Sequence, residues 1–310
     1  MAKIFFAGDL RSPFIKADLE MLQENHIVET FDLGKYAFSF KQALQYQYWC
    51  LKQSVAIAKS NIVWIWFADY PALPLILLAK LFHKPIVVNV GGWEVYKAPD
   101  INYGNQLKPI RGAVTRWILR NVDRCVVPSN AYRTIIHTLE PQAYVCCFPN
   151  YIDTKLCDEP LPEKEQIVVT AYCTDSARLV KGIPTFEQAS ALVPYEMKAI
   201  KNISHESLMD EFKHAKVYCQ LSYTESFGMS LLEAMACGCV PVVTDRDALP
   251  EVVGHCGFVV PYGDVKATVD AIVKAMVADG TKARERARIF SREKKKAQVE
   301  ALLRHLIKGG

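Results

Sequence analysis

The sequence lacks the short signatures that mark several large enzyme classes. It has no G-x-G-x-x-G turn, which weakens a dehydrogenase interpretation, no Walker lysine motif and no G-x-S-x-G nucleophile elbow. Its ten cysteines contain no C-x-x-C spacing, so a structural zinc site is not predicted. These absences argue against the most common cofactor-dependent, ATP-dependent and hydrolytic enzymes.

A long hydrophobic run is also missing. The longest apolar region, 62–79, is interrupted near its middle by Asp69, Pro71 and Pro74, so it predicts a strand, a loop and a helix rather than a membrane span. Residues 1–7 hold one lysine and a short apolar stretch, which predicts a first β-strand rather than a signal peptide. We therefore expect a cytoplasmic protein with reduced, half-buried thiols.

Charge and composition are moderate. The net charge of +4 is compatible with anionic ligands such as diphosphates or lipid headgroups, and it does not require nucleic acid as a partner. With 51% hydrophobic and 23% charged residues, the chain has the composition of a globular protein with a large core. Its 310 residues favour two domains of about 150 residues each.

Short apolar runs alternate with helical patterns through both halves, and a polar, proline-punctuated linker near 148–165 separates them. This alternation predicts parallel sheets with crossover helices, whose ligands bind at the carboxyl ends of the strands. We predict two Rossmann-like α/β domains, 1–149 and 150–284, with a cleft between them. The predicted strands are 3–7, 27–31, 62–66, 86–90, 125–127, 144–147, 167–171, 195–200, 217–220, 240–243 and 257–260. The predicted helices lie near 12–25, 40–59, 71–82, 107–121, 129–138, 183–193, 205–214, 228–237, 264–278 and 282–308.

The stretch 221–254 is the most informative part of the chain. A loop that holds Glu225 leads into the predicted helix 228–237. Gly228, at the start of this helix, lets a ligand approach backbone N–H groups, and a helix N-terminus favours anionic or oxygen-rich ligands. Glu233 lies within an otherwise apolar helix, where a carboxylate is unfavourable unless a salt bridge, exposure to solvent or a ligand satisfies it.

This stretch resembles the E-x7-E segment of retaining glycosyltransferases of family 4, with Glu225 and Glu233 at the spacing of that motif. The likeness continues through E-A-M-A-C-G, P-V-V and P-E-V-V-G, and weaker likenesses are F-P-N-Y-I-D at 148–153 and V-K-G-I at 180–183. The resemblance implies the GT-B architecture. It also implies that the last helix, about 285–310, packs back on the N-terminal domain.

The resemblance implies a role for each matching residue. The catalytic pair would be Glu225, which hydrogen-bonds to donor-sugar hydroxyls, and Lys181, which stabilises charge on the departing diphosphate. Glu233 would accept hydrogen bonds from the ribose, and Gly8 would let the first loop approach the diphosphate. Backbone N–H groups near the helix start would bind the donor sugar, at Phe227, Gly228, Met229 and Ser230.

Two positions depart from the family pattern. The arginine that usually precedes the lysine is absent near Ala171-Tyr172, and Arg178 is the candidate that replaces it as a third catalytic residue. The histidine that often ends the fourth strand is also absent. Gly91 and Gly92 stand there instead, and they either open the backbone to the sugar or acceptor or form an ordinary glycine turn.

We expect no metal and no cofactor beyond the nucleotide-sugar donor. Asp245-Arg246-Asp247 has the D-x-D spacing of the other glycosyltransferase architecture, but its place before P-E-V-V-G predicts a loop and a helix start. The lysine and the helix N-termini would balance the negative charge of the diphosphate in place of a divalent cation.

Arg116, Arg120 and Arg124 recur every four residues and are predicted to share one helix face beside Trp117. Either this stripe contacts an anionic membrane on its cytoplasmic (inner) face, where it would meet a lipid-linked acceptor, or it is a solvated surface.

The sequence therefore predicts a metal-independent retaining glycosyltransferase of the hexosyltransferase type. Its acceptor would be a hydroxyl of a glycan, a lipid or a lipid-linked glycan. Two alternatives are a nucleotide-sugar epimerase, against which the E-x7-E segment argues, and a non-catalytic nucleotide-sugar-binding subunit. The donor base, the donor sugar and the acceptor cannot be read from the residues.

Overall fold

The computed structural model describes residues 1–35 and 40–308, which form two compact units. The N-terminal unit comprises Met1–Pro128, Tyr132–Phe148 and the chain from Lys296 onward, and the C-terminal unit comprises Ser129–Ala131 and Pro149–Lys295. The main division thus falls next to the predicted linker. Residues 285–295 belong to the C-terminal unit, and the part of the last helix that belongs to the N-terminal unit begins at Lys296.

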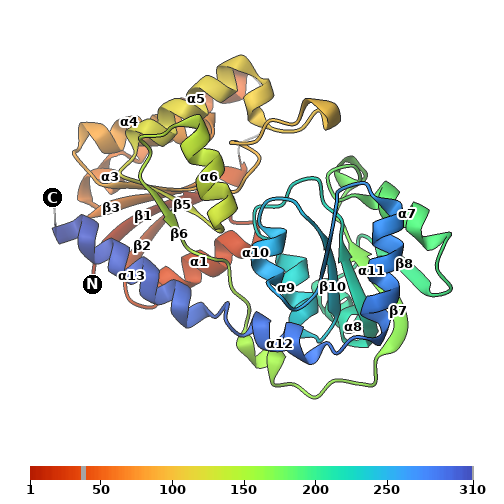
Figure 1. The fold of residues 1–310 in the computed structure, drawn as a ribbon. Coiled ribbons are helices and arrows are strands. Elements are labelled where there is room, and N and C mark those ends of the chain that lie inside the picture. The colour runs from red at the N-terminus through yellow and green to blue at the C-terminus, as the bar shows by residue number, and fades with distance from the viewer. Residues whose placement is uncertain (36–39, 309–310) are drawn as a thin grey trace. The chain divides into compact units, whose positions relative to one another are not determined.

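A six-stranded parallel sheet forms the centre of the N-terminal unit, and helices flank it (Figure 1). Its order is β2-β1-β3-β4-β5-β6, so the direction of strand addition reverses between β1 and β3. The strands are β1 (Lys3–Gly8), β2 (Ile27–Asp32), β3 (Ile62–Trp66), β4 (Ile86–Asn89), β5 (Arg124–Val127) and β6 (Val145–Cys147). The helices are α1 (Pro13–Gln23), α2 (Phe40–Lys52), α3 (Ser54–Lys59), α4 (Leu73–Leu81), α5 (Pro109–Asn121) and α6 (Asn130–Leu139). The six strand predictions for this half are confirmed.

Two predictions for this unit were wrong in detail. The helix predicted over 40–59 is two helices, because α2 ends at Lys52, before Gln53, and α3 begins at Ser54. Arg124 does not belong to the helix of Arg116 and Arg120, because α5 ends at Asn121 and Val122 is already extended. Arg124 is the first residue of β5, so the three arginines do not share one helix face.

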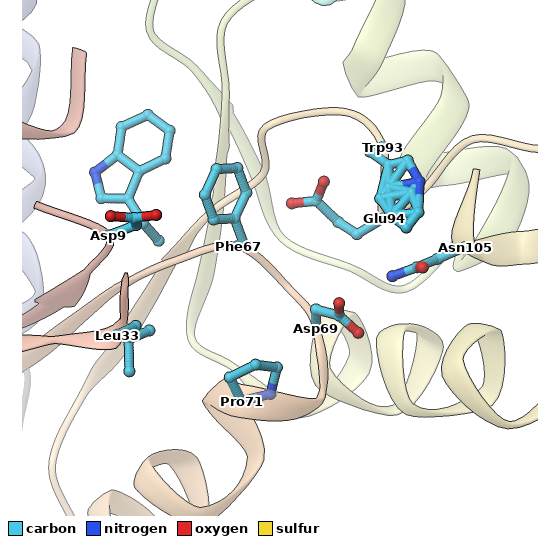
Figure 2. A pocket seen from close by; sticks show the side chains of 9 residues that line it. Asp9, Leu33, Phe67, Asp69, Pro71, Trp93, Glu94 and Asn105 are labelled. Carbon is cyan, nitrogen blue, oxygen red and sulfur yellow. The ribbon is translucent and has the colours of Figure 1, made fainter. Parts of the chain in front are cut away.

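The loops that leave β1, β2, β3 and β4 at their carboxyl ends gather at one edge of this sheet. They line a cavity beside the reversal between β1 and β3, and Figure 2 shows the side chains around it. A reversal of strand order sends neighbouring connections to opposite faces of the sheet and leaves a crevice where ligands bind.

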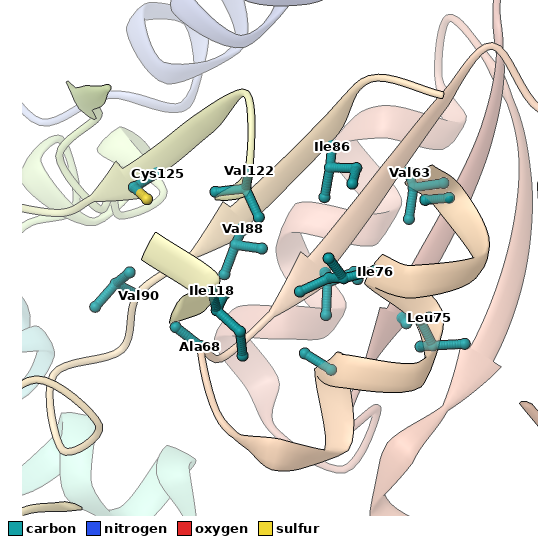
Figure 3. Close-up of a cluster of buried hydrophobic side chains, with 14 of the residues drawn as sticks. Val63, Ala68, Leu75, Ile76, Ile86, Val88, Val90, Ile118, Val122 and Cys125 are labelled. Carbon is teal, nitrogen blue, oxygen red and sulfur yellow. The ribbon is translucent and has the colours of Figure 1, made fainter. Parts of the chain in front are cut away.

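The central strands of the N-terminal unit are continuous apolar runs because both of their faces are buried. Every residue of β3 and β4 is buried, as expected for parallel strands covered by helices on both faces. Figure 3 shows the packing of Val88 on the sheet with Ile76 of α4 and Ile118 of α5.

The C-terminal unit is built on a five-stranded parallel sheet with the order β11-β10-β9-β7-β8, which reverses between β7 and β9. The strands are β7 (Glu165–Ala171), β8 (Glu196–Ile200), β9 (Ala215–Gln220), β10 (Val240–Thr244) and β11 (Phe258–Val260). Its helices are α7 (Ile183–Ser190), α8 (His205–His214), α9 (Met229–Ala236), α10 (Leu249–Val253), α11 (Val265–Val277) and α12 (Thr281–Ala287). The chain ends in α13 (Arg292–Lys308), of which only the residues before Lys296 belong to this unit. The strands and helices predicted for this half are confirmed, except that the charged tail is two helices.

The last helix, α13, belongs to the N-terminal unit from Lys296 onward. Lys296 pairs with Glu24 at 2.5 Å, and Glu300 contacts the ring of His26 at 3.0 Å. None of the described helices is long and apolar enough to cross a membrane. All ten cysteines are free thiols, of which six are buried, three are half-buried as expected for all of them, and Cys173 is exposed.

Candidate functional site

A cavity of about 390 Å³ lies at the carboxyl ends of β7 and β8. Because the strand order reverses on the other side of β7, this edge is where an open parallel sheet is expected to bind its ligand. Lys181 and Lys201 line the cavity, together with Ser230 of α9, and each lysine is paired with a carboxylate of the chain. Two cations at such an edge suit an anionic ligand such as a diphosphate.

The two residues predicted to act in catalysis contact each other. Lys181 Nζ donates to Glu225 Oε2 at 2.5 Å, and the side chains are 27% and 14% exposed. Gly182, directly after the lysine, has a φ of +66° and starts α7 close to the carbonyl of Leu221. A Cβ at this position would stand only 1.8 Å from that carbonyl oxygen. A glycine is therefore required directly after the lysine.

Buried polar groups position Glu225. Gln220 donates from Nε2 to the same carboxylate oxygen at 3.2 Å, and the Tyr218 hydroxyl donates to Gln220 at 2.7 Å. On the other side, the Glu225 backbone N–H donates to Asp247 at 3.3 Å, and Thr224 donates to Asp247 at 2.5 Å. The carboxylate is thus held at the end of β9 with its orientation set from two directions.

Glu233 has a partner that the sequence analysis did not foresee. Its carboxylate is 15% exposed and lies 2.9 Å from Nε2 of His205, a residue whose side chain is 68% exposed. Burial raises the pKa of Glu233, and the hydrogen bond from His205 opposes that shift. In the sequence, His205 stands at the start of a predicted helix, within the segment 198–208 that resembles the family's loop beneath the nucleotide base.

The turn before α9 has the backbone geometry expected of a ligand-binding helix start. Gly228 has a φ of +93° and precedes Met229, the first residue of α9. Phe227 is buried and packs edge-on against Phe290, with ring centroids 5.3 Å apart. This packing anchors the turn, and Ser230 on the first turn of α9 lines the cavity.

Arg178, the third predicted catalytic residue, is paired elsewhere in this structure. Its guanidinium contacts Glu187 at 2.7 Å and the hydroxyl of Tyr172 at 3.4 Å. Tyr172 lines the cavity, so Arg178 reaches the lining only through that ring. Lys201 lines the cavity and pairs with Asp175 at 2.8 Å. It lies in the segment 198–208, which resembles the family's loop beneath the nucleotide base, but it was not predicted as a site residue.

Gly8, Gly91 and Gly92 lie in the N-terminal unit, where close packing accounts for the first two and a positive φ of +130° for the third. A Cβ on Gly8 would stand 2.9 Å from Ile15, and one on Gly91 would stand 2.3 Å from the ring of Phe67. The N–H groups of Gly91 and Gly92 each donate to Glu94 at 2.9 Å. These N–H groups therefore bind a buried carboxylate of the chain instead of opening toward a ligand.

The D-x-D sequence forms a loop and a helix start, and its carboxylates have partners. Asp247 accepts hydrogen bonds from Thr224 and Glu225, and Asp245 accepts one from the N–H of Tyr262 at 3.3 Å. Within the described residues, no group of three or more His, Cys, Asp or Glu side chains is arranged to hold a metal ion.

The three arginines of the predicted stripe also have partners. Arg116 donates to Gln106 at 2.7 Å, and Arg120 forms a two-pronged pair with Glu140 at 2.7 and 3.0 Å. Arg124 donates to the carbonyl of Asp123 and contacts His305 of α13.

A family model and curated relatives match parts of this chain. Residues 187–296 match the family described as "Glycosyl transferases group 1". The chain is 35% identical over 77 residues to the O-antigen chain mannosyltransferase B of Escherichia coli, which is 25% of this chain and 20% of that protein. It is 36% identical over 95 residues to the phosphatidyl-myo-inositol mannosyltransferase of Mycobacterium leprae, 30% of this chain and 25% of that protein. The chain spans about a fifth to a half of the length of the curated relatives it matches.

Solved structures resemble the whole chain. The sucrose-phosphate synthase of Thermosynechococcus elongatus has a TM-score of 0.82 at 18% identity, with 100% of both chains covered. HepE of Anabaena in complex with UDP-glucose has a TM-score of 0.76 at 14% identity, with 99% of this chain and 100% of that chain covered. The two Rossmann-like units and these neighbours together show the GT-B fold.

Proposed function

We propose that this protein is a retaining glycosyltransferase, which transfers a sugar from a nucleoside-diphosphate sugar to a hydroxyl of a glycan, a lipid or a lipid-linked acceptor. The observation that carries the proposal is the carboxyl edge of the C-terminal sheet, where Lys181 and Lys201 line one cavity and Lys181 contacts Glu225. The family match over residues 187–296 and the UDP-glucose held by the HepE structure support it.

In this proposal the donor diphosphate binds to Lys181 and Lys201. The bond between the anomeric carbon and the diphosphate oxygen breaks, and Lys181 offsets the negative charge that develops on the departing nucleotide. The acceptor oxygen bonds to the anomeric carbon on the same face, and its proton passes to the departing phosphate. Glu225 accepts hydrogen bonds from the donor-sugar hydroxyls, and the N–H groups at the start of α9 bind the same sugar.

Glu233 would bind the ribose of the donor. Two neighbouring ribose hydroxyls can both donate to one carboxylate, which would satisfy this buried group better than an exposed histidine does. The donor would therefore displace His205 from Glu233. We propose that no metal and no cofactor take part, because lysines and a helix N-terminus can carry the charge of the diphosphate.

We also propose a cytoplasmic protein whose acceptor is presented at a membrane surface. Arg116, Arg120 and Arg124 already contact groups of the chain. Other residues of the surface would therefore have to make the membrane contact. Sedimentation with anionic liposomes at low and high salt tests this proposal, and an unchanged supernatant fraction at low salt would exclude it.

Nucleotide binding at the cavity can be tested on the protein without its acceptor. UDP and GDP are titrated by calorimetry, and Glu233→Ala is expected to weaken the better ligand by about 1–3 kcal/mol through lost charge-assisted hydrogen bonds. Glu165→Ala, at the exposed amino end of β7, is the matched control and should not change affinity. Equal affinities of the two variants would contradict the ribose assignment.

Cys173 offers a second measurement at the same place. It lines the cavity and is exposed, whereas the nine other thiols are buried or half-buried. Bound nucleotide should therefore protect Cys173 selectively from alkylation, as read by mass spectrometry. Equal labelling of Cys173 with and without saturating nucleotide would place the nucleotide elsewhere.

The reaction itself requires product analysis with a panel of nucleotide sugars, with and without excess EDTA. Transfer to an acceptor with retained anomeric configuration, equal in both conditions, is the expected result. Isomerised donor would indicate an epimerase, and binding without any product would indicate a non-catalytic subunit. Loss of transfer on chelation, restored by a divalent cation, would contradict metal independence.

A further inference from the structure

The outer surface of helices α2, α3 and α4 is apolar at positions where a surface helix is normally polar. Such a helix buries one apolar stripe and turns charged and polar residues to the solvent. Here α3 and α4 bury an apolar stripe that includes Ile57, Leu75 and Ile76, and they also expose apolar side chains away from the core. Every residue of α4 other than Lys80 is apolar. The exposed apolar side chains therefore need a reason other than the core.

The exposed apolar side chains lie on neighbouring helices. Tyr48 and Leu51 are three residues apart on α2, and Leu77 and Leu81 are four apart on α4, so each pair shares one helix face. Val55 of α3 completes the set, and all five side chains are between 51% and 69% exposed. Both α2 and α3 pack against α4, and α3 and α4 lie side by side in Figure 1. These residues and the lysines beside them are called the α2–α4 face below.

The charge of the α2–α4 face is positive. Residues 33–93 contain six lysines and a single acidic residue, Asp69, which pairs with Arg111. The lysines that lie among or beside the apolar side chains are Lys52, Lys59, Lys80 and Lys84. Within the part of the chain that the structure describes, none of these four lysines forms an ion pair. On the flanking strand β2, Glu29 is the exposed carboxylate, which sets one negative charge against four positive ones.

Two aromatic rings lie at one end of the α2–α4 face. Tyr48 and Trp49 meet edge to face with their centroids 6.1 Å apart, and Lys52 Nζ lies 4.7 Å from the first ring and 5.0 Å from the second. Trp49 is 37% exposed, whereas the other four tryptophans are buried or half-buried. Tyrosine, tryptophan and lysine each combine an apolar body with a polar tip, which suits the boundary between an apolar layer and water.

A lipid surface fits this combination better than other partners do. Nucleic acids and phosphate groups are bound preferentially through arginine, and residues 33–93 contain no arginine. A second copy of the same face would bring lysines against lysines. A bilayer takes up aliphatic side chains below its headgroups, while lysines contact anionic headgroups at the surface.

We infer that the α2–α4 face docks this protein on an anionic lipid bilayer. Its aliphatic side chains enter below the headgroups, and its lysines contact the headgroups. The inference deepens the proposed function and rests on it for the statement that an acceptor is presented at the membrane. The docking itself follows from the exposed apolar side chains and the charge of the face.

Cosedimentation with vesicles of phosphatidylcholine, with and without phosphatidylglycerol, measures the docking. The protein should bind the anionic vesicles at low salt and the neutral ones at least about tenfold more weakly. Rising salt should release it, because the Debye length shrinks. No binding to anionic vesicles at low salt, or equal binding to both kinds of vesicle, would overturn the inference.

The charge variant combines three reversals on the face, Lys52→Glu, Lys59→Glu and Lys80→Glu. It should weaken binding to anionic vesicles at least about a hundredfold, since each lysine near such a surface contributes about fivefold. Its control makes the same net change at three exposed positions of the C-terminal unit, Lys266→Glu, Lys274→Glu and Lys282→Glu. Equal weakening by the two variants would show a response to net charge alone and would refute the docking face.

The apolar variant, Leu51→Asn with Leu81→Asn, changes two exposed side chains and leaves the charge of the face intact. It should weaken binding at least about tenfold, because less apolar surface leaves the water. Leu192→Asn with Val277→Asn, at exposed positions of the C-terminal unit, is the control that should bind as the parent does. Parental binding of the apolar variant would exclude insertion of the face.

Trp49 reports the place of contact. Brominated phosphatidylcholine in the anionic vesicles should quench the tryptophan fluorescence of the bound protein, and Trp49→Phe should lose most of this quenching. Quenching that persists in Trp49→Phe would place the contact elsewhere. Sedimentation velocity without vesicles tests the other occupant of the face. A dimer that dissociates in the apolar variant would replace the membrane by a second copy.

The same samples separate this inference from the proposed function. If a sugar is transferred while the parent does not bind vesicles, the transferase stands and the docking face fails. If the parent binds vesicles through this face but no nucleotide protects Cys173, the docking face stands and the transferase proposal fails.

Discussion

Glu225 and Glu233 belong to the same unit and differ in how their charge is balanced. Glu225 has a lysine partner, a neutral donor from Gln220 and its own backbone held by Asp247. Among the residues that the structure describes, the carboxylate of Glu233 is paired only with the exposed ring of His205, and burial raises its pKa. The first carboxylate is therefore stabilised within the protein. The second is stabilised less within the protein, because the hydrogen bond from His205 does not offset the effect of burial on its pKa.

This difference predicts how stability depends on pH. The unfolded state loses the proton of residue 233 near the ordinary value of 4.5, while the folded state keeps it to a higher pH. As pH rises through that interval the unfolded state binds fewer protons than the native one, so the free energy of unfolding falls. Glu233→Gln should remove this contribution to the decrease in the free energy of unfolding. The variant should therefore gain stability relative to the parent as pH rises from 4.5.

Urea unfolding followed by circular dichroism, at several pH values from 4.5 to neutral, measures the difference. The matched variant is Glu165→Gln, which changes an exposed glutamate of the same unit. A difference between Glu233→Gln and the parent that does not change with pH would show that burial does not perturb Glu233.

At the scale of elements, the missing side chain of Gly182 lets the start of α7 pack closely against the loop after β9. Gly182 and Gly263 both have a positive φ, +66° and +79°, but a Cβ at 182 would overlap the Leu221 carbonyl whereas a Cβ at 263 would meet nothing within 4 Å. Their alanine variants therefore separate backbone strain from steric overlap.

Gly263→Ala should lower the free energy of unfolding by about 1–2 kcal/mol, the strain of a left-handed alanine. Gly182→Ala should lower it by more than about 3 kcal/mol, because the overlap must push α7 or the loop away. It should also weaken nucleotide binding, since Lys181 moves with the helix start. Equal losses of stability in the two variants, measured by urea unfolding, would mean that the contact with Leu221 relaxes freely.

At the scale of the whole molecule, the C-terminal end of the chain stabilises the N-terminal unit. Leu303 of α13 is 1% exposed. On earlier turns of the same helix, Lys296 pairs with Glu24 and Glu300 contacts His26. Because all five tryptophans lie in the N-terminal unit, their fluorescence reports the unfolding of that unit selectively.

Leu303→Ala should lower the stability reported by tryptophan fluorescence by about 2–5 kcal/mol through the cavity it leaves. Arg304→Ala, at the next and exposed position, is the control and should change it by less than about 0.5 kcal/mol. If the tryptophan transition of Leu303→Ala coincides with that of the parent, α13 does not stabilise the N-terminal unit.

Much of this architecture could be predicted from local patterns. Apolar runs such as 62–66 and 86–90 predicted buried parallel strands, and Gly228 marked a helix start, because periodicity and backbone sterics act over a few residues. The same kind of reasoning failed for Arg124, where a four-residue recurrence continued past the true end of α5. Spacing alone does not reveal where a helix stops.

The tertiary structure alone decided which side chains meet at the sheet edges. Lys181 and Glu225 are 44 residues apart, and they pair because β7 and β9 are neighbours in the sheet. The contact of His205 with Glu233 depends likewise on the packing of two separate helices, α8 and α9. Local sequence determines each strand and helix, but strand order is a global property of packing, and it is strand order that places these loops together.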